Sequence, residues 1–112
     1  VQDVVSFALR KVAGIGETPD ADQSADALER LSDMLEQWRQ SGADVGATRP
    51  LELSTVLYAP ESYLGAIKAN LIVQVSDLYG LELSPVTVQN ARYGLAHIKS
   101  ANLKSRLEAE YY

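Results

Sequence analysis

Two apolar stripes with helical spacing, each ending at a glycine, constrain the fold of this 112-residue chain most strongly. The first runs from Leu28 to Trp38 ahead of Gly42, and the second runs from Leu64 onward to Gly80. Apolar residues three and four positions apart share one face of a helix, and glycine readily adopts the left-handed conformation that follows many helix ends. The pattern predicts amphipathic helices and therefore an all-α fold.

Turn and capping residues bound the first two helices. We expect the first helix over about residues 1–12, ended by Gly14 and Gly16. The second begins with Asp20 or Asp22 as its N-cap, because a side-chain oxygen there accepts a hydrogen bond from a free amide of the first turn. The apolar stripe of this second helix consists of Ala21, Leu28, Leu31, Leu35 and Trp38.

The other two helices follow a long connecting segment. The third starts near Pro60, and the fourth starts with Ser84 as N-cap and Pro85 in the first helical position, then runs to about Leu107. The third helix has the stripe Leu64, Ile67, Leu71, Val75 and Leu78, widened by Ile72, Val73 and Tyr79, which places it at the centre of the bundle. The fourth has the stripe Val88, Ala91, Leu95, Ile98 and Asn102, where the polar Asn102 marks the end of the core.

The segment from Ala43 to Ala59 lacks helical spacing. Residues 51–58 alternate partly and are rich in β-branched and aromatic residues, which predicts a long loop or a short β-hairpin between helices two and three. A connection of this length is uncommon without a role. It either caps the bundle or contacts a partner, and we expect Tyr58 to be exposed.

Charge is segregated along the chain, whose net charge is −5. Residues 17–36 hold seven acids and one base, whereas residues 85–106 hold four bases, one histidine and no acid. The pattern is typical of two solvated helix faces. It is equally compatible with head-to-tail assembly, in which the acidic helix of one subunit lies beside the basic helix of the next.

Residue types that carry catalysis and metal binding are scarce. The chain has no cysteine, which excludes disulfides, thiolate metal sites and cysteine nucleophiles. His97 is the single histidine, and we expect it at the surface. Asp20, Asp22 and Asp26 lack the glycine and glutamate of a calcium-binding loop. We therefore expect no enzymatic activity, no metal and no cofactor; no apolar run approaches the roughly 20 residues of a membrane span.

Several sequence blocks, taken in order, carry a family resemblance over roughly residues 5–102. They are Ala8–Val12, Leu28–Gly42, Asn70–Gly80, Ser84–Pro85, Ala91, Ile98–Lys99 and Asn102. Together they resemble the head-to-tail adaptors of tailed bacteriophages, the packaged-DNA stabilisation or tail accessory factor family.

The resemblance implies a structural virion protein of the head–tail neck, present in the host cytoplasm during assembly. Such adaptors form a ring, usually of twelve copies, under the portal protein. The ring extends the DNA channel, retains packaged DNA and provides a docking platform for the next tail component, such as a nozzle, hub or tail-completion protein. DNA passes through the lumen without sequence-specific binding, and acidic or neutral walls suit that passage because they do not hold phosphates. No membrane is involved.

In this family the segment after the last helix grips the portal, so we divide the chain into a helical adaptor domain, residues 1–107, and a C-terminal tail, residues 108–112. Two adjacent tyrosines at the end suit an interface anchor. The portal-binding candidates are Arg106, Leu107, Glu108, Glu110, Tyr111 and Tyr112. The ring-interface or tail-contact candidates are Asp26, Glu29, Asp33, Arg49, Tyr58, Arg92, Lys99 and Lys104. Tyr63 and Tyr93 are further aromatic candidates for these contacts. Each of the three tyrosines, Tyr58 included, is equally compatible with a core position, and for Tyr93 we expect the core.

Two other functions remain open. In a small DNA-binding transcriptional regulator, the first two helices would form a helix-turn-helix, but the second would be the recognition helix and is the most acidic element. A non-ring helical scaffold or chaperone would instead hold a partner helix in an apolar groove. Because helical patterning is already present at Val1, we expect further residues ahead of it.

Overall fold

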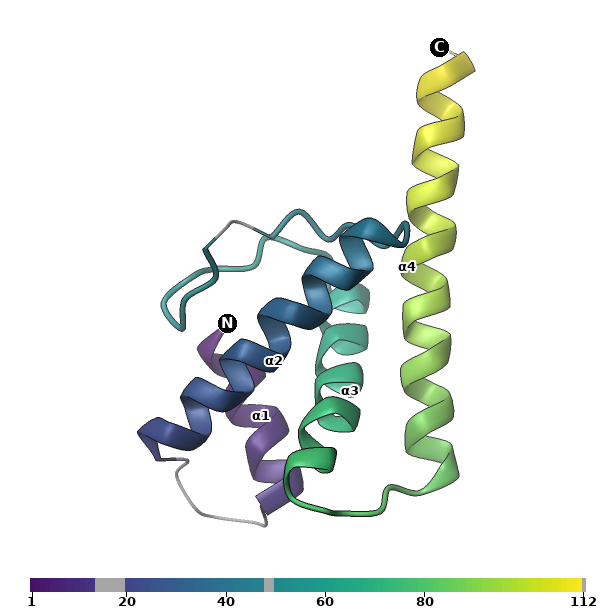
Figure 1. Cartoon of the computed structure of the whole chain (residues 1–112). Helices are drawn as coiled ribbons and strands as arrows, with labels where there is room; N and C mark the ends of the chain where they lie inside the picture. Colours follow the sequence, from purple (N-terminus) through teal and green to yellow (C-terminus); the bar gives the residue numbers. More distant parts are fainter. Residues whose placement is uncertain (14–19, 48–49, 112) are drawn as a thin grey trace.

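A computed structural model describes residues 1–13, 20–47 and 50–111, and this part of the chain is all-helical without strands (Figure 1). The helices are α1 (Gln2–Ala13), α2 (Ala21–Gln40), α3 (Glu61–Leu78) and α4 (Pro85–Tyr111). The predicted all-α fold is confirmed.

Helices α1, α2 and α3 enclose most of the core. In Figure 1, α2 crosses obliquely over α1 and α3. The buried face of α2 differs in part from the predicted stripe. Ala27 and Met34 are buried, whereas Leu28 is half-buried and Ala21 is exposed. The seven largest fully buried side chains come from all four helices: Val5, Leu9, Leu31, Ile67, Leu71, Val75 and Ile98.

The central position predicted for the third helix is confirmed, since α3 packs against α1, α2 and α4. Its apolar residues surround the helix rather than forming one stripe, as expected of an element covered on several sides. The last turn extends beyond the core: Leu78 and the following Tyr79 are 42% and 37% exposed.

The helix boundaries follow from local chemistry. Asp20 is the N-cap of α2 and forms a capping box with Gln23, in which each side chain accepts a hydrogen bond from the other residue's backbone amide. Ser84 caps α4, because its Oγ accepts a hydrogen bond from the Thr87 amide. Gly42 and Gly80 have φ angles of 95° and 64°, so both predicted glycine ends are confirmed. The predicted end at Gly14 and Gly16 lies outside the described residues.

Helix α4 is held to α3 by a close approach of small residues. A Cβ atom on Gly94 would lie 2.7 Å from the Cβ of Ala66, so only glycine fits at this crossing. The Asn70 side chain donates hydrogen bonds to the carbonyl oxygens of Ala66 and Ala91, both at 2.8 Å, and the second bond joins α3 to α4. These contacts set the position from which α4 extends.

The far half of α4 extends beyond the rest of the molecule (Figure 1). Near its midpoint, the Asn102 side chain accepts a hydrogen bond of 2.9 Å from the Asp44 amide. Every residue from Leu103 to Ala109 is exposed, so the core does end at Asn102 as the sequence predicts. The helix itself continues to Tyr111, past the predicted end at Leu107.

The connection between α2 and α3 is extended and contains no strand in its described residues, 41–47 and 50–60. Burial alternates along residues 50–60, so that Leu53, Thr55 and Leu57 face inward while Val56 and Tyr58 are exposed. The segment is joined to the start of α1 because the Gln2 amide donates to the Leu53 carbonyl at 3.0 Å. The connection thereby covers one end of the helices, on the side where the N-terminus lies (Figure 1).

Candidate interaction surfaces

No group of three or more His, Asp or Glu side chains in the described part of the chain could hold a metal ion. His97 is exposed, as predicted, and its ring makes an edge contact with Tyr63 at a centroid distance of 6.3 Å. None of the described helices is both long enough and apolar enough to span a bilayer. Surfaces are therefore the features to consider.

The first surface is the acidic side of α2. Asp26, Glu29 and Asp33, three of the predicted ring-interface residues, are exposed and together line a cavity of about 320 Å³. Leu78, from the end of α3, and the basic Arg30 also line this cavity, so three acids and one base surround it. None of the three acids forms an ion pair with another described residue. Their charge is therefore available to a basic partner.

The next acid along α2, Glu36, differs from these three because it already has a partner within the helix. Glu36 accepts hydrogen bonds from Arg39, the shorter of which is 2.7 Å. That hydrogen bond, and secondly the negative charge of Glu36, raise the pKa of Arg39 above its ordinary value. The unpaired acidic surface thus ends at Asp33, ahead of the last turns of α2.

The second surface lies on α4. Lys99, Leu103 and Arg106 line a cavity of about 200 Å³ together with Ser41 and Gly42, which follow the end of α2. Neither Lys99 nor Arg106 forms an ion pair within the described part of the chain. Leu103 is 54% exposed. The structure thus brings one predicted ring residue, Lys99, beside one predicted portal residue, Arg106.

The remaining basic candidates on α4 divide between two sides of the helix. Arg92, Lys99 and Arg106 are spaced by seven residues, so they share one flank. Lys104 is five residues from Lys99 and lies on another side. Both Arg92 and Lys104 are exposed.

The predicted portal-binding residues lie on or beyond the extending half of α4. Arg106, Leu107 and Glu108 are exposed and helical. Glu110 and Tyr111 belong to the same helix, but their side chains are outside the described set, as is all of Tyr112. Portal binding by this segment stays a prediction.

Tyr93 is not a core residue, and its predicted burial is wrong. It is 64% exposed, and its hydroxyl accepts a hydrogen bond of 2.7 Å from the Gln89 side chain. The core side of α4 is defined by Ala91 and Ile98, and Tyr93 lies on the opposite side of the helix. Val86, seven residues earlier, is also exposed, at 66%. Helix α4 therefore carries apolar residues on two opposite faces.

The α2–α3 connection presents the most exposed aromatic residue of the described chain. Tyr58 is 91% exposed, as predicted. Arg49, the other candidate in this segment, lies outside the described residues.

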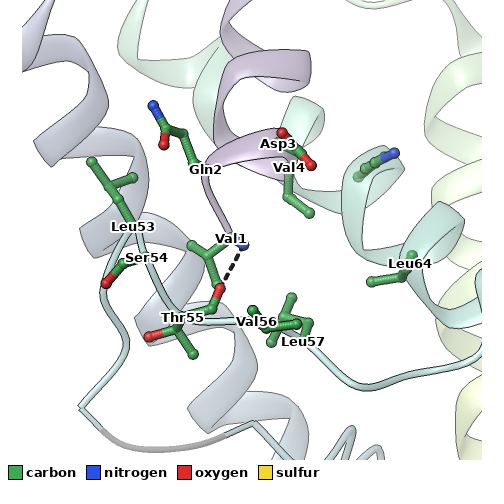
Figure 2. Close-up of a pocket in the computed structure, with 11 residues that line it drawn as sticks. Val1, Gln2, Asp3, Val4, Leu53, Ser54, Thr55, Val56, Leu57 and Leu64 are labelled. Atoms are coloured by element: carbon green, nitrogen blue, oxygen red, sulfur yellow. Dashed lines mark hydrogen bonds between the residues drawn. The ribbon is translucent and has the colours of Figure 1, made fainter.

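The same connection also forms a cavity that the sequence did not indicate. Figure 2 shows it between the first turn of α1, residues 53–57 and α3. Its volume is about 400 Å³, and the lining includes Val4, Leu57 and Leu64. The hydrogen bond from the Val1 amine to the Thr55 carbonyl, 2.8 Å long, crosses one side of it. Sequence reasoning missed this cavity because its walls are some 50 residues apart in the chain; the alternation of residues 51–58 was the only available signal.

Comparison with known proteins gives no relative: neither a protein-family model nor any curated protein matches the chain. Function must therefore be argued from the surfaces described above.

Proposed function

We propose that this chain is a structural adaptor of a tailed bacteriophage, which forms a ring of about twelve copies under the portal protein. In this role the ring extends the DNA channel, retains packaged DNA and offers a platform to the next tail component. The proposal joins the family resemblance of the sequence to the arrangement of its exposed surfaces.

The observation that carries the proposal is the extending half of α4. Helix α4 leaves its own core at Asn102 and continues to Tyr111, and every residue from Leu103 to Ala109 is exposed. Leu103 and Leu107 are 54% and 45% exposed there. Exposed apolar residues on a projecting element are typical of a segment that binds a partner. In the proposed complex this arm docks on the portal.

Charge supports the remainder of the proposal. A closed ring of identical subunits needs two different, complementary surfaces on each subunit. The acidic side of α2 and the basic flank of α4 meet that requirement. The net charge of −5 also suits a channel that DNA crosses without being held, because phosphate-neutralising lysines would retain the duplex.

A binding experiment with a portal ring tests the proposal. The full chain is mixed with purified portal rings of tailed phages, and the bound fraction is measured by co-sedimentation. A variant that ends at Asn102 removes the arm and leaves the core intact. The matched control is Val86→Ala, which removes an exposed apolar side chain from the other end of α4, outside both sets of candidate binding residues.

We expect the full chain and Val86→Ala to sediment with the portal and the shortened variant to remain in the supernatant. Absence of binding to any portal, combined with tight binding to duplex DNA, would contradict the adaptor and support a transcriptional regulator. Binding of all three proteins alike would show that α4 is not the portal arm.

A further inference from the structure

We propose that two copies of this chain dock through one specific contact, in which the flank of α4 around Leu103 enters the cavity between α2 and Leu78 of the next copy. The inference rests on the ring of the proposed function and names the partner of these two surfaces as a second copy. The basic residues Lys99 and Arg106 then meet the acidic residues Asp26 and Asp33.

The first argument is the matching spacing of the charges. On α2, acids recur at alternating intervals of four and three residues: Asp22, Asp26, Glu29, Asp33 and Glu36. On α4, bases recur every seven residues: Arg92, Lys99 and Arg106. The acids have a mean spacing of 3.5 residues and the bases recur at twice that spacing, so both patterns fit the seven-residue repeat that keeps side chains in register between two helices packed side by side.

The second argument is that each charged surface contains an exposed leucine. Leu103 lies between Lys99 and Arg106 and is 54% exposed, while Leu78 lines the acidic cavity and is 42% exposed. Contact between these two leucines would give the charged strips an apolar centre. Interfaces commonly combine a buried apolar centre with a polar rim.

The third argument is that one molecule cannot make this contact with itself. The acidic cavity lies along the middle of α2, from Asp26 to Asp33, whereas the basic cavity adjoins Ser41 and Gly42 after the end of this helix. Asp33 and Ser41 are eight residues apart, which corresponds to roughly 12 Å along a helix axis. Asp26, Glu29 and Asp33 form no ion pair within the described residues, and neither do Lys99 and Arg106. The complement of each strip is therefore available only on another copy, as a head-to-tail contact requires.

The size of the contact predicts how strong it is. Lys99 to Arg106 spans about two helical turns, or roughly 10 Å. A strip of this length buries less than the roughly 1,200 Å² of a typical stable interface, so isolated copies associate weakly. Copies held next to one another on a template reach a high effective concentration, and the same contact then persists.

Disulfide trapping tests the contact, because the natural chain has no cysteine. The variants Leu78→Cys and Leu103→Cys are prepared separately, one with a mass tag, and are mixed at high concentration under mild oxidation. We expect a mixed disulfide dimer to accumulate. The matched control pair is Ser54→Cys with Leu103→Cys, in which the exposed Ser54 lies outside the proposed contact. Circular dichroism of each variant confirms that it is folded.

Charge reversal then identifies what holds the pair together. Asp26→Lys with Asp33→Lys is added to the Leu78→Cys chain, and Lys99→Glu with Arg106→Glu is added to the Leu103→Cys chain. Either reversal alone places like charges opposite one another and is expected to lower the mixed-dimer yield about tenfold. Both reversals together restore the opposite signs and should restore the yield.

Equal yields for the test pair and the control pair would overturn the contact, as would a failure of the double reversal to restore the yield. The full chain separates these outcomes from those of the portal experiment, because the variant that ends at Asn102 also lacks Leu103 and Arg106. If the full chain binds the portal but no mixed disulfide is trapped, the result contradicts this contact and supports the adaptor function. If the mixed disulfide forms and the double charge reversal restores its yield, but the full chain does not bind the portal, the result supports the contact and contradicts the adaptor function.

Discussion

Gly94 is the residue on which the contact between α3 and α4 depends most directly. A methyl group there would lie 2.7 Å from the Cβ and 3.1 Å from the Cα of Ala66. Because the second atom belongs to the backbone, relief requires the two helices to separate. Gly65, a neighbour of Ala66, differs completely, since a Cβ there would meet nothing within 4 Å.

These two glycines give the first prediction. Gly94→Ala should destabilise the chain by about 1–3 kcal/mol through overpacking. Gly65→Ala, its matched control, should stabilise the chain by about 0.5–1 kcal/mol, because alanine has the higher helix propensity. Urea unfolding followed by circular dichroism measures both. Similar free energies of unfolding for the two variants would mean that the helices do not cross as closely as described.

At the residue scale, the sequence predicted some positions and missed others for a physical reason. The exposure of Tyr58 was predicted, and the N-cap of α2 was narrowed to Asp20 or Asp22, of which the structure has Asp20. The position of Tyr93 was not predicted correctly, because apolar residues occur on two sides of α4 and the sequence does not say which side meets α3. The small residues Gly94 and Ala66 decide it, and their importance appears only once the two helices are packed.

At the scale of elements, the helix starts were easier to predict than the end of α4. Serine and proline at positions 84 and 85 specify a start through capping and a fixed φ angle. After Leu107 there is no glycine or proline to end the helix, and α4 continues to Tyr111. The end predicted at Leu107 came from the apolar stripe, which reports the extent of the core rather than the extent of the helix.

The extending half of α4 gives the second prediction. A variant that ends at Asn102 should unfold at nearly the same temperature as the full chain, because residues 103–109 are all exposed and bury no core surface. Surface changes of this kind usually alter the free energy of unfolding by no more than about 0.5 kcal/mol. Differential scanning calorimetry of both proteins tests it. A large loss of stability would show that the arm packs on its own subunit and is not free to bind a partner.

At the scale of the whole molecule, the sequence predicted the all-α class and the central helix, because both follow from hydrophobic spacing. The cavity beside the α2–α3 connection could not be predicted in this way, because it depends on contacts distant in the chain, such as that between Gln2 and Leu53. The charged surfaces were predicted only in part. Their residues were recognised in the sequence, but the structure supplies the two leucines that complete them.

The stoichiometry of the complex with a portal ring tests the central claim most directly. Native mass spectrometry of the purified complex gives the number of copies of this chain on each portal ring. The adaptor account predicts one copy for each portal subunit, bound as a closed second ring. A complex with only one or two copies, or a mass equal to that of the portal alone, would contradict it.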